Sequence, residues 1–229
     1  MAPRTCVVGV ALAAALLAGC ESDSARLNRM GLEAYYQGEY RQALAAFEEA
    51  VAANPDMGTY YFNCGMAEQA LGDLDRALFL YRIATKLNPS AVEAYRHMAT
   101  CHLAKGEPQK ALGVLETGTK ANPYTGDAFV NVARYYLDRK DPSVSRDEAM
   151  KQARLWLAKA VAADPDSARA HREFGLFLVR LGEREKGIEH LRRSMELAPV
   201  QPELSARLSE MEPSGPEKSG LPPPQMETE

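Results

Sequence analysis

Two histidines and a cysteine near the middle of the chain carry side chains that can bind metals or act as nucleophiles. His97 and Cys101 are four residues apart, so a helix would place them on one face, and His102 follows directly. Further ligands do not cluster near them in the sequence, although a protein metal site usually needs them. The sequence also contains no P-loop and no HExxH, CxxCH or GxSxG motif. We therefore expect no enzymatic activity, no bound metal and no cofactor.

The N-terminal segment ends in a cysteine whose thiol is a candidate for covalent modification. Arg4 supplies a positive charge, residues 7–17 form an apolar run that is too short to span a bilayer, and Leu17-Ala18-Gly19-Cys20 follows. These four residues resemble the lipobox of bacterial lipoproteins. The resemblance implies that residues 1–19 are a cleaved signal peptide and that Cys20 carries diacylglycerol and palmitate-type acyl chains, which together anchor a protein stably.

Two alternatives remain for this segment: an ordinary secretory signal with a coincidental cysteine, or an apolar tail that is retained as an anchor. With lipidation, we expect the protein in the bacterial cell envelope, facing the periplasm. Glu21 follows the cysteine, and the absence of Asp at that position favours the outer membrane.

The net charge and the two remaining cysteines argue against a nucleic-acid-binding protein and against a disulfide-stabilised fold. The net charge is −4, and a nucleic-acid partner would require a concentrated excess of Lys and Arg, so we expect none. Cys64 and Cys101 form no disulfide framework, and we interpret them as small packed residues inside helices.

The chain contains an internal repeat that is marked by prolines. Asn-Pro pairs begin at positions 54, 88 and 122, which are 34 residues apart, and Asp164-Pro165 and Ala198-Pro199 are again 34 residues apart. Small residues recur at fixed positions of each period, as in Gly31, Ala43 and Ala50 of the first. A 34-residue period with this pattern resembles the tetratricopeptide repeat family.

The resemblance implies an all-α, right-handed superhelical solenoid of about five helical hairpins with a C-terminal capping helix. Eight extra residues split the fourth repeat, where Pro142 ends a helix and a capping box at Ser145 begins the next. The expected segments are the signal peptide (1–19), a lipidated linker (20–23), five repeats (24–57, 58–91, 92–125, 126–167 and 168–201), the capping helix (202–211) and a disordered Pro-rich tail (212–229).

Proteins of this family bind extended segments in a concave groove that is lined by the first helix of each hairpin. Mapping those positions onto this sequence gives the candidate partner-binding residues Leu32, Tyr35, Tyr36, Phe62, Asn63, Met66, Arg96, Asn131, Arg134, Arg169, Arg172 and Arg180. We predict a groove that is aromatic near the anchor and basic at the far end, suited to a peptide with apolar and acidic groups. Alternatively, Tyr35 and Phe62 pack against neighbouring helices, and the arginines form a solvated face with acidic partners such as Glu173.

The implied function is that of a membrane-anchored protein–protein interaction scaffold of the bacterial envelope. Lipoproteins that pilot secretins in type IV pilus assembly, and those of tight-adherence pilus systems, share this plan of signal, short linker and repeats. Two alternatives remain open: an adaptor that presents substrates to a periplasmic protease, and a structural oligomeriser.

Overall fold

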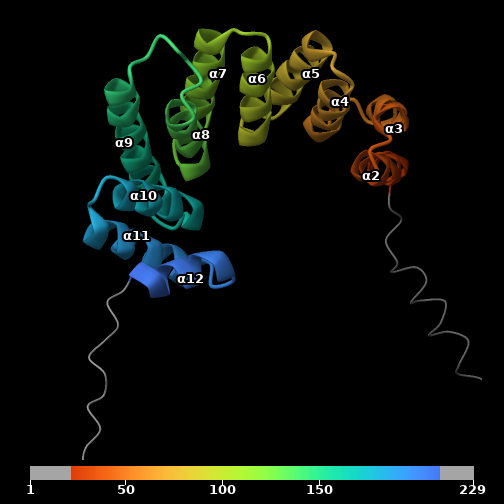
Figure 1. The fold of residues 1–229 in the computed structure, drawn as a ribbon. Helices are drawn as coiled ribbons and strands as arrows, with labels where there is room; N and C mark the ends of the chain where they lie inside the picture. The colour runs from red at the N-terminus through yellow and green to blue at the C-terminus, as the bar shows by residue number, and fades with distance from the viewer. Residues whose placement is uncertain (1–21, 212–229) are drawn as a thin grey trace, which may run out of the picture. The chain divides into compact units, whose positions relative to one another are not determined.

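The computed structural model describes residues 22–211, and these residues contain helices but no strand (Figure 1). The chain divides into two compact units, of which unit 1 ends at Ala121 and unit 2 begins at Asn122. The helices of unit 1 are α2 (Asp23–Tyr36), α3 (Tyr40–Ala53), α4 (Gly58–Leu71), α5 (Leu74–Leu87), α6 (Val92–Ala104) and α7 (Pro108–Ala121). Those of unit 2 are α8 (Gly126–Leu137), α9 (Arg146–Ala163), α10 (Ala168–Arg180), α11 (Arg184–Leu197) and α12 (Pro202–Met211).

The predictions made for the two ends of the chain cannot be compared with the structure. The signal peptide, Cys20 and the Pro-rich tail lie outside the described residues. The first helix, α2, begins at Asp23, where the Ser22 hydroxyl accepts a hydrogen bond from the Ala25 amide at 3.2 Å. None of the helices in residues 22–211 is long and apolar enough to cross a membrane.

Unit 1 is a stack of three helical hairpins, α2/α3, α4/α5 and α6/α7 (Figure 1). The two helices of a hairpin approach closely because glycines face aromatic rings. A Cβ atom added at Gly31 would lie 2.5 Å from the Phe47 ring, and one at Gly65 would lie 2.6 Å from the Tyr81 ring. Phe47 and Tyr81 are fully buried. The small residues that recur in the sequence pattern, such as Gly31, therefore permit the close packing of the hairpins in unit 1.

Unit 2 contains two hairpins, α8/α9 and α10/α11, followed by the single helix α12. Leu157 of α9 and Val130 of α8 are fully buried in its main core. The α10/α11 hairpin repeats the close approach, because a Cβ added at Gly175 would lie 2.7 Å from Cγ of Leu191. Helix α12 places Leu204 and Leu208 against Leu191, so it covers the end of the stack. The described residues thus hold five hairpins and a capping helix, which confirms the predicted fold class.

The turns inside the hairpins differ between the fourth repeat and the others. Gly38, Gly72, Gly106 and Gly182 adopt positive φ values directly after a first helix, a conformation that costs glycine little. Arg139 takes this position in the fourth repeat, with φ of 51°. Its amide donates to Tyr136 O at 3.0 Å, which is the same bond that Gly38 makes to Tyr35 O. A side chain with a Cβ therefore holds a strained turn at the start of the eight-residue insert.

The insert ends as the sequence predicts, with a capping residue at Ser145. The Glu148 amide donates to the Ser145 hydroxyl at 3.2 Å, and α9 begins at the next residue, Arg146. The Glu148 carboxylate accepts a hydrogen bond from Gln152 at 2.8 Å, so its side chain points along the helix. Within the insert, the Ser143 amide donates to the Asp141 carboxylate at 2.9 Å, which closes a local turn.

Candidate partner-binding site

The candidate residues of unit 1 lie on the first helices α2, α4 and α6, and most of them are used in packing. Leu32 and Tyr35 pack against the core of the first hairpin, while Phe62 and Met66 pack against the core around Tyr81. All four are only partly exposed. For Tyr35 and Phe62 this is the packing that we considered as the alternative, while all four side chains keep part of their surface exposed, so their contact with a partner stays a prediction. Tyr36 differs, with 82% of its surface exposed.

Asn63 and Asn131 are too buried to meet a partner, because their exposed fractions are only 4% and 5%. Asn63 Nδ2 donates to Asn28 Oδ1 at 2.6 Å and so joins α4 to α2 inside unit 1. Asn131 Oδ1 accepts from Arg169 at 3.0 Å inside unit 2. Both amides connect neighbouring first helices, so they position the surface that a partner would contact.

The histidine at position 97 belongs to a polar network in unit 1. An arginine always donates, so His97 Nε2 accepts from Arg96 at 3.0 Å, and its proton lies on Nδ1, which donates to Gln69 Oε1 at 3.0 Å. The Tyr81 hydroxyl donates to the same Gln69 oxygen at 2.8 Å. Burial, together with the charge of Arg96, lowers the pKa of His97 to about 4. His97 is thus a neutral packing residue.

The two cysteines are buried, as predicted for small packed residues. Burial raises the pKa of the Cys64 thiol to about 12 and that of Cys101 to about 11, so both remain protonated at neutral pH. Within residues 22–211 there is no group of three or more His, Cys, Asp or Glu side chains placed to hold a metal ion.

In unit 2, the first helices α8 and α10 carry a ladder of charged side chains. Arg169 lies 3.3 Å from the Asp127 carboxylate and donates to Asn131. One turn further along α10, the Glu173 carboxylate lies 3.3 Å from Arg134 and 3.7 Å from Arg172. One carboxylate is therefore shared by two guanidinium groups, and each guanidinium has five N–H donors. Most of these donors are not used by Glu173.

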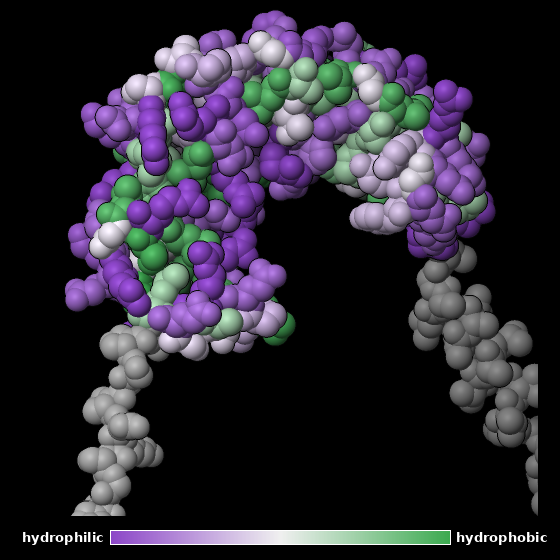
Figure 2. Space-filling model, in the orientation of Figure 1, coloured by the Kyte–Doolittle hydropathy of each residue, from purple (hydrophilic) through white to green (hydrophobic). Residues whose placement is uncertain are grey.

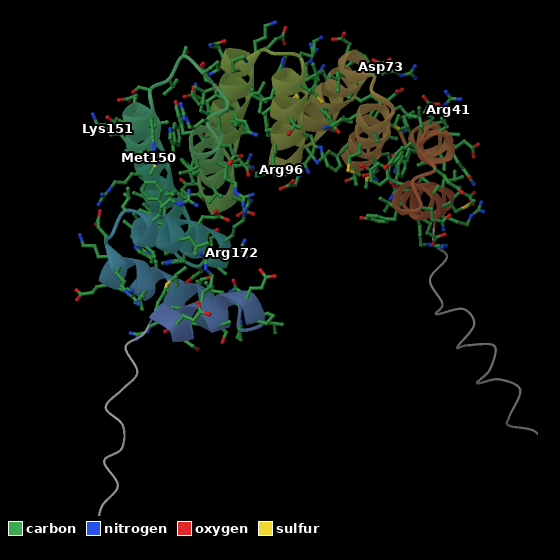
Figure 3. All side chains as sticks on the ribbon, viewed as in Figure 1. Arg41, Asp73, Arg96, Met150, Lys151 and Arg172 are labelled. Carbon is green, nitrogen blue, oxygen red and sulfur yellow. The ribbon has the colours of Figure 1, made fainter. Side chains whose placement is uncertain are left out.

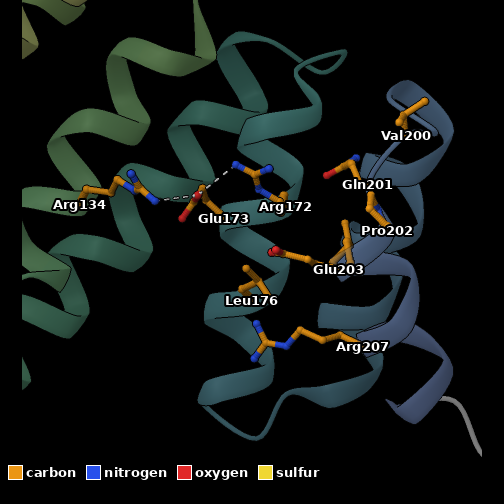
Figure 4. Close-up of a pocket in the computed structure, with 10 residues that line it drawn as sticks. Arg134, Arg172, Glu173, Leu176, Val200, Gln201, Pro202, Glu203 and Arg207 are labelled. Carbon is orange, nitrogen blue, oxygen red and sulfur yellow. Dashed lines mark hydrogen bonds and ion pairs between the residues drawn. The ribbon is translucent and has the colours of Figure 1, made fainter. Parts of the chain in front are cut away.

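The Arg134–Glu173–Arg172 group forms one wall of a cavity of about 530 Å³ in unit 2 (Figure 4). The opposite wall is the corner before α12 and the first turns of α12. The lining residues are Arg134, Arg172, Glu173, Leu176, Val200, Gln201, Pro202, Glu203, Leu204 and Arg207. We call this cavity the α10–α12 pocket. Figure 4 shows Arg207 reaching from α12 toward Leu176, with the Glu203 side chain extending into the same space.

Hydrogen bonds at both ends hold α12 in place. At its start, the Gln201 side chain donates to Ala198 O at 2.7 Å and to Ser194 O at 3.0 Å. At its end, Arg184 donates to Met211 O at 2.6 Å and 3.1 Å. The Ser194 hydroxyl, at a position where the first, second and fourth repeats have Ala and the third has Gly118, is fully buried and donates to Ala168 O at 2.8 Å. The wall that α12 contributes is therefore a fixed surface.

The sequence prediction missed the residues that α12 contributes to this pocket. Glu203 and Arg207 are charged residues of the predicted capping helix, so the sequence indicated their exposure but not their proximity to α10. Arg180, a predicted groove residue, lines a different pocket with Arg139, Arg146 and Met150. Arg96 lies on α6 in unit 1, and Arg172 lies on α10 in unit 2 (Figure 3).

Hydrophilic side chains cover most of the visible face of both units in Figure 2, with apolar patches between them. Among the exposed apolar residues of unit 2, Val200 at the mouth of the pocket is 92% exposed.

Comparisons with known proteins agree on the fold. Residues 28–80 and 68–127 match two tetratricopeptide repeat family models. No curated protein matches the sequence. The structure resembles a thermophilic repeat protein of Thermus thermophilus, with a TM-score of 0.57 and 20% identity over 82% of this chain and 98% of that one.

Two further solved structures have the same fold. PilF of Pseudomonas aeruginosa gives a TM-score of 0.56 with 14% identity, over 82% of this chain and 83% of that one. PilW, a widely conserved type IV pilus biogenesis factor, gives 0.53 with 17% identity, over 82% and 85%. Residues 28–127 therefore carry tetratricopeptide repeats, and the described residues share the fold of the solved repeat protein, a fold that suggests protein–protein interaction.

Proposed function

We propose that this protein is a membrane-anchored scaffold of the bacterial envelope that binds a segment of another protein through unit 2. The observation that carries the proposal is the α10–α12 pocket, where three arginines and an exposed valine surround an open cavity on a repeat fold. Unit 1 supports this assignment indirectly, because its corresponding side chains are mostly used in packing.

The proposed anchor is a lipid on Cys20. The lipobox-like residues 17–20 support it, and α2 begins at Asp23, so only Glu21 and Ser22 separate the lipidated residue from the first helix. Such a short connection would keep the first hairpin close to the membrane surface, on its periplasmic side.

The anchor is tested by membrane fractionation of cells that produce the full chain. Cys20→Ser is expected to move the protein from the membrane fraction to the soluble fraction, because the acyl chains can no longer be attached. Cys6→Ser is the matched control, since it changes a cysteine of the N-terminal segment outside the lipobox. Unchanged membrane attachment of Cys20→Ser would show that another element anchors the protein.

The proposed process is assembly of a pilus or secretion complex at the outer membrane. The resemblance to lipoproteins of this kind and the shared fold with PilF and PilW support it. The test is cross-linking in cells followed by purification of the tagged full chain. Recovery of a secretin or pilus subunit supports the proposal, recovery of a protease would favour a substrate adaptor, and recovery of this chain alone would favour an oligomeriser.

A further inference from the structure

We propose that the α10–α12 pocket binds an acidic side chain of the partner segment, and that Val200 and Leu176 contact an apolar side chain next to it. This inference rests on the proposed function and specifies the chemistry of the partner. It also assigns a binding role to α12, which the repeat pattern alone describes as a cap.

The charges that line the pocket favour an anion. Three arginines face two glutamates there, and Glu173 is committed to Arg134 and Arg172. The Glu173 side chain is only 12% exposed, so it serves as an internal brace for the two guanidinium groups. Arg207 has no ion-pair partner within residues 22–211 and directs its charge into the pocket (Figure 4). An entering carboxylate would receive charge-assisted hydrogen bonds from Arg207 and from the unused donors of Arg172.

The apolar part of the lining favours a neighbouring hydrophobic side chain. Leu176, Leu204 and Pro202 line the pocket together with Val200. Leu204 is buried and packs with Leu191, so packing on its other side holds this part of the lining in place. Val200 is almost fully exposed at the mouth, and contact with a partner would remove its surface from water. The volume lies within the range of about 300–1,000 Å³ that is usual for ligand sites.

Glu203 places a negative charge in the same pocket as the arginines. Its carboxylate extends into the pocket from the first turn of α12 and would repel an acidic ligand (Figure 4). Removing this charge should therefore strengthen the binding of an acidic peptide, whereas removing Arg172 or Arg207 should weaken it. General damage to the surface would weaken binding in all three variants, so the opposite signs separate recognition from damage.

The experiment uses the immobilised full chain and a display library of random octapeptides as the probe. We expect enrichment of peptides with Asp or Glu adjacent to Leu, Ile, Val or Phe. One enriched peptide is then resynthesised with its acidic residue and with Gln in that place. Fluorescence polarisation measures the Kd of both peptides for wild type, R172A, R207A and E203Q, with K151A, which removes an exposed positive charge of α9 outside the pocket, as the control.

For the acidic peptide, R207A should raise Kd roughly tenfold, equivalent to about 1.4 kcal/mol, and E203Q should lower it several-fold. For the Gln peptide, R207A should change Kd by less than about twofold, because this peptide lacks the carboxylate that Arg207 would contact. The two peptides and the two proteins together form a double-mutant cycle that isolates this charge contact. K151A should leave both Kd values near those of wild type. Circular dichroism and melting temperature verify that the variants fold.

The outcomes separate this inference from the function on which it rests. Enriched peptides that are neutral or basic, or acidic peptides whose Kd is unaffected by R172A and R207A, would overturn the assignment of the pocket while peptide binding itself stands. Failure of the wild-type chain to enrich any peptide would overturn the proposed function and, with it, the inference.

Discussion

The first-helix faces of the two units use similar positions for different purposes. In unit 1, Phe62 packs beside Tyr81 and His97, with ring centroids 5.6 Å and 5.3 Å apart, and the polar atoms of this group bond to one another. In unit 2, Asn131 Nδ2 is buried without a hydrogen bond among the described residues, and Arg172 shares the Glu173 carboxylate with Arg134. Unit 1 is internally satisfied, and unit 2 keeps unused hydrogen-bonding capacity.

This difference teaches that a position in a repeat does not define a role. Aromatic side chains on α4 fill the space between neighbouring helices, so they stabilise the stack. Arginines at comparable positions on α8 and α10 extend beyond the packed layer, where long side chains keep their charge in water. Stability should therefore depend most on the first-helix residues of unit 1, and binding on those of unit 2.

The largest effect is expected from Phe62→Ala. Phe62 is partly buried against the Tyr81 core, so we expect the substitution to lower the free energy of unfolding by about 2–3 kcal/mol. Tyr36→Ala is the control, because Tyr36 is 82% exposed and its loss should change stability by less than about 0.5 kcal/mol. Urea denaturation followed by circular dichroism measures both. Equal effects of the two substitutions would contradict the assignment of Phe62 to the core.

The next largest effect is a pH dependence of the free energy of unfolding, which comes from His97. Its pKa is about 4 in the folded protein and about 6.5 when exposed, so below pH 6.5 the unfolded chain binds a proton that the folded chain excludes. The stabilisation is complete above pH 6.5 and is lost as the pH falls toward 4, by about 2 kcal/mol once partial solvent screening is allowed for.

Denaturation at pH 7 and pH 4.5 measures this loss, with His97→Gln as the comparison. The substitution should reduce the pH dependence, since Gln does not titrate. Burial and the neighbouring His171 also lower the pKa of His190 in unit 2, so part of the dependence should remain. An identical pH dependence in the variant and in wild type would show that His97 is not the titrating group.

The smallest effect is a stabilisation in unit 2. Arg139 adopts φ of 51° at a turn where four other hairpins have Gly, so we expect Arg139→Gly to raise the melting temperature through a gain of about 1 kcal/mol. Gly182→Ala should act in the opposite direction, since Gly182 has φ of 85°. A lower melting temperature for Arg139→Gly would indicate that the arginine side chain makes a contact that outweighs its strained backbone.

The sequence by itself determined the helical hairpins and their order. The period of 34 residues, the small residues such as Gly31 and Gly65, and the capping residue Ser145 act locally or between adjacent helices, so their pattern is readable without coordinates. The buried state of Cys64 and Cys101 followed from the same register.

Only the tertiary structure decided which side chains of a first helix are free for a partner. Phe62 and Arg172 look equally available from their positions, but one fills a gap between helices and the other lines an open cavity. Arg207 lines that cavity because the hydrogen bond from Gln201 to Ser194 O and the packing of Leu204 against Leu191 hold α12 beside the hairpin. Such proximity depends on the angle of a chain reversal, and one-dimensional spacing does not encode that angle.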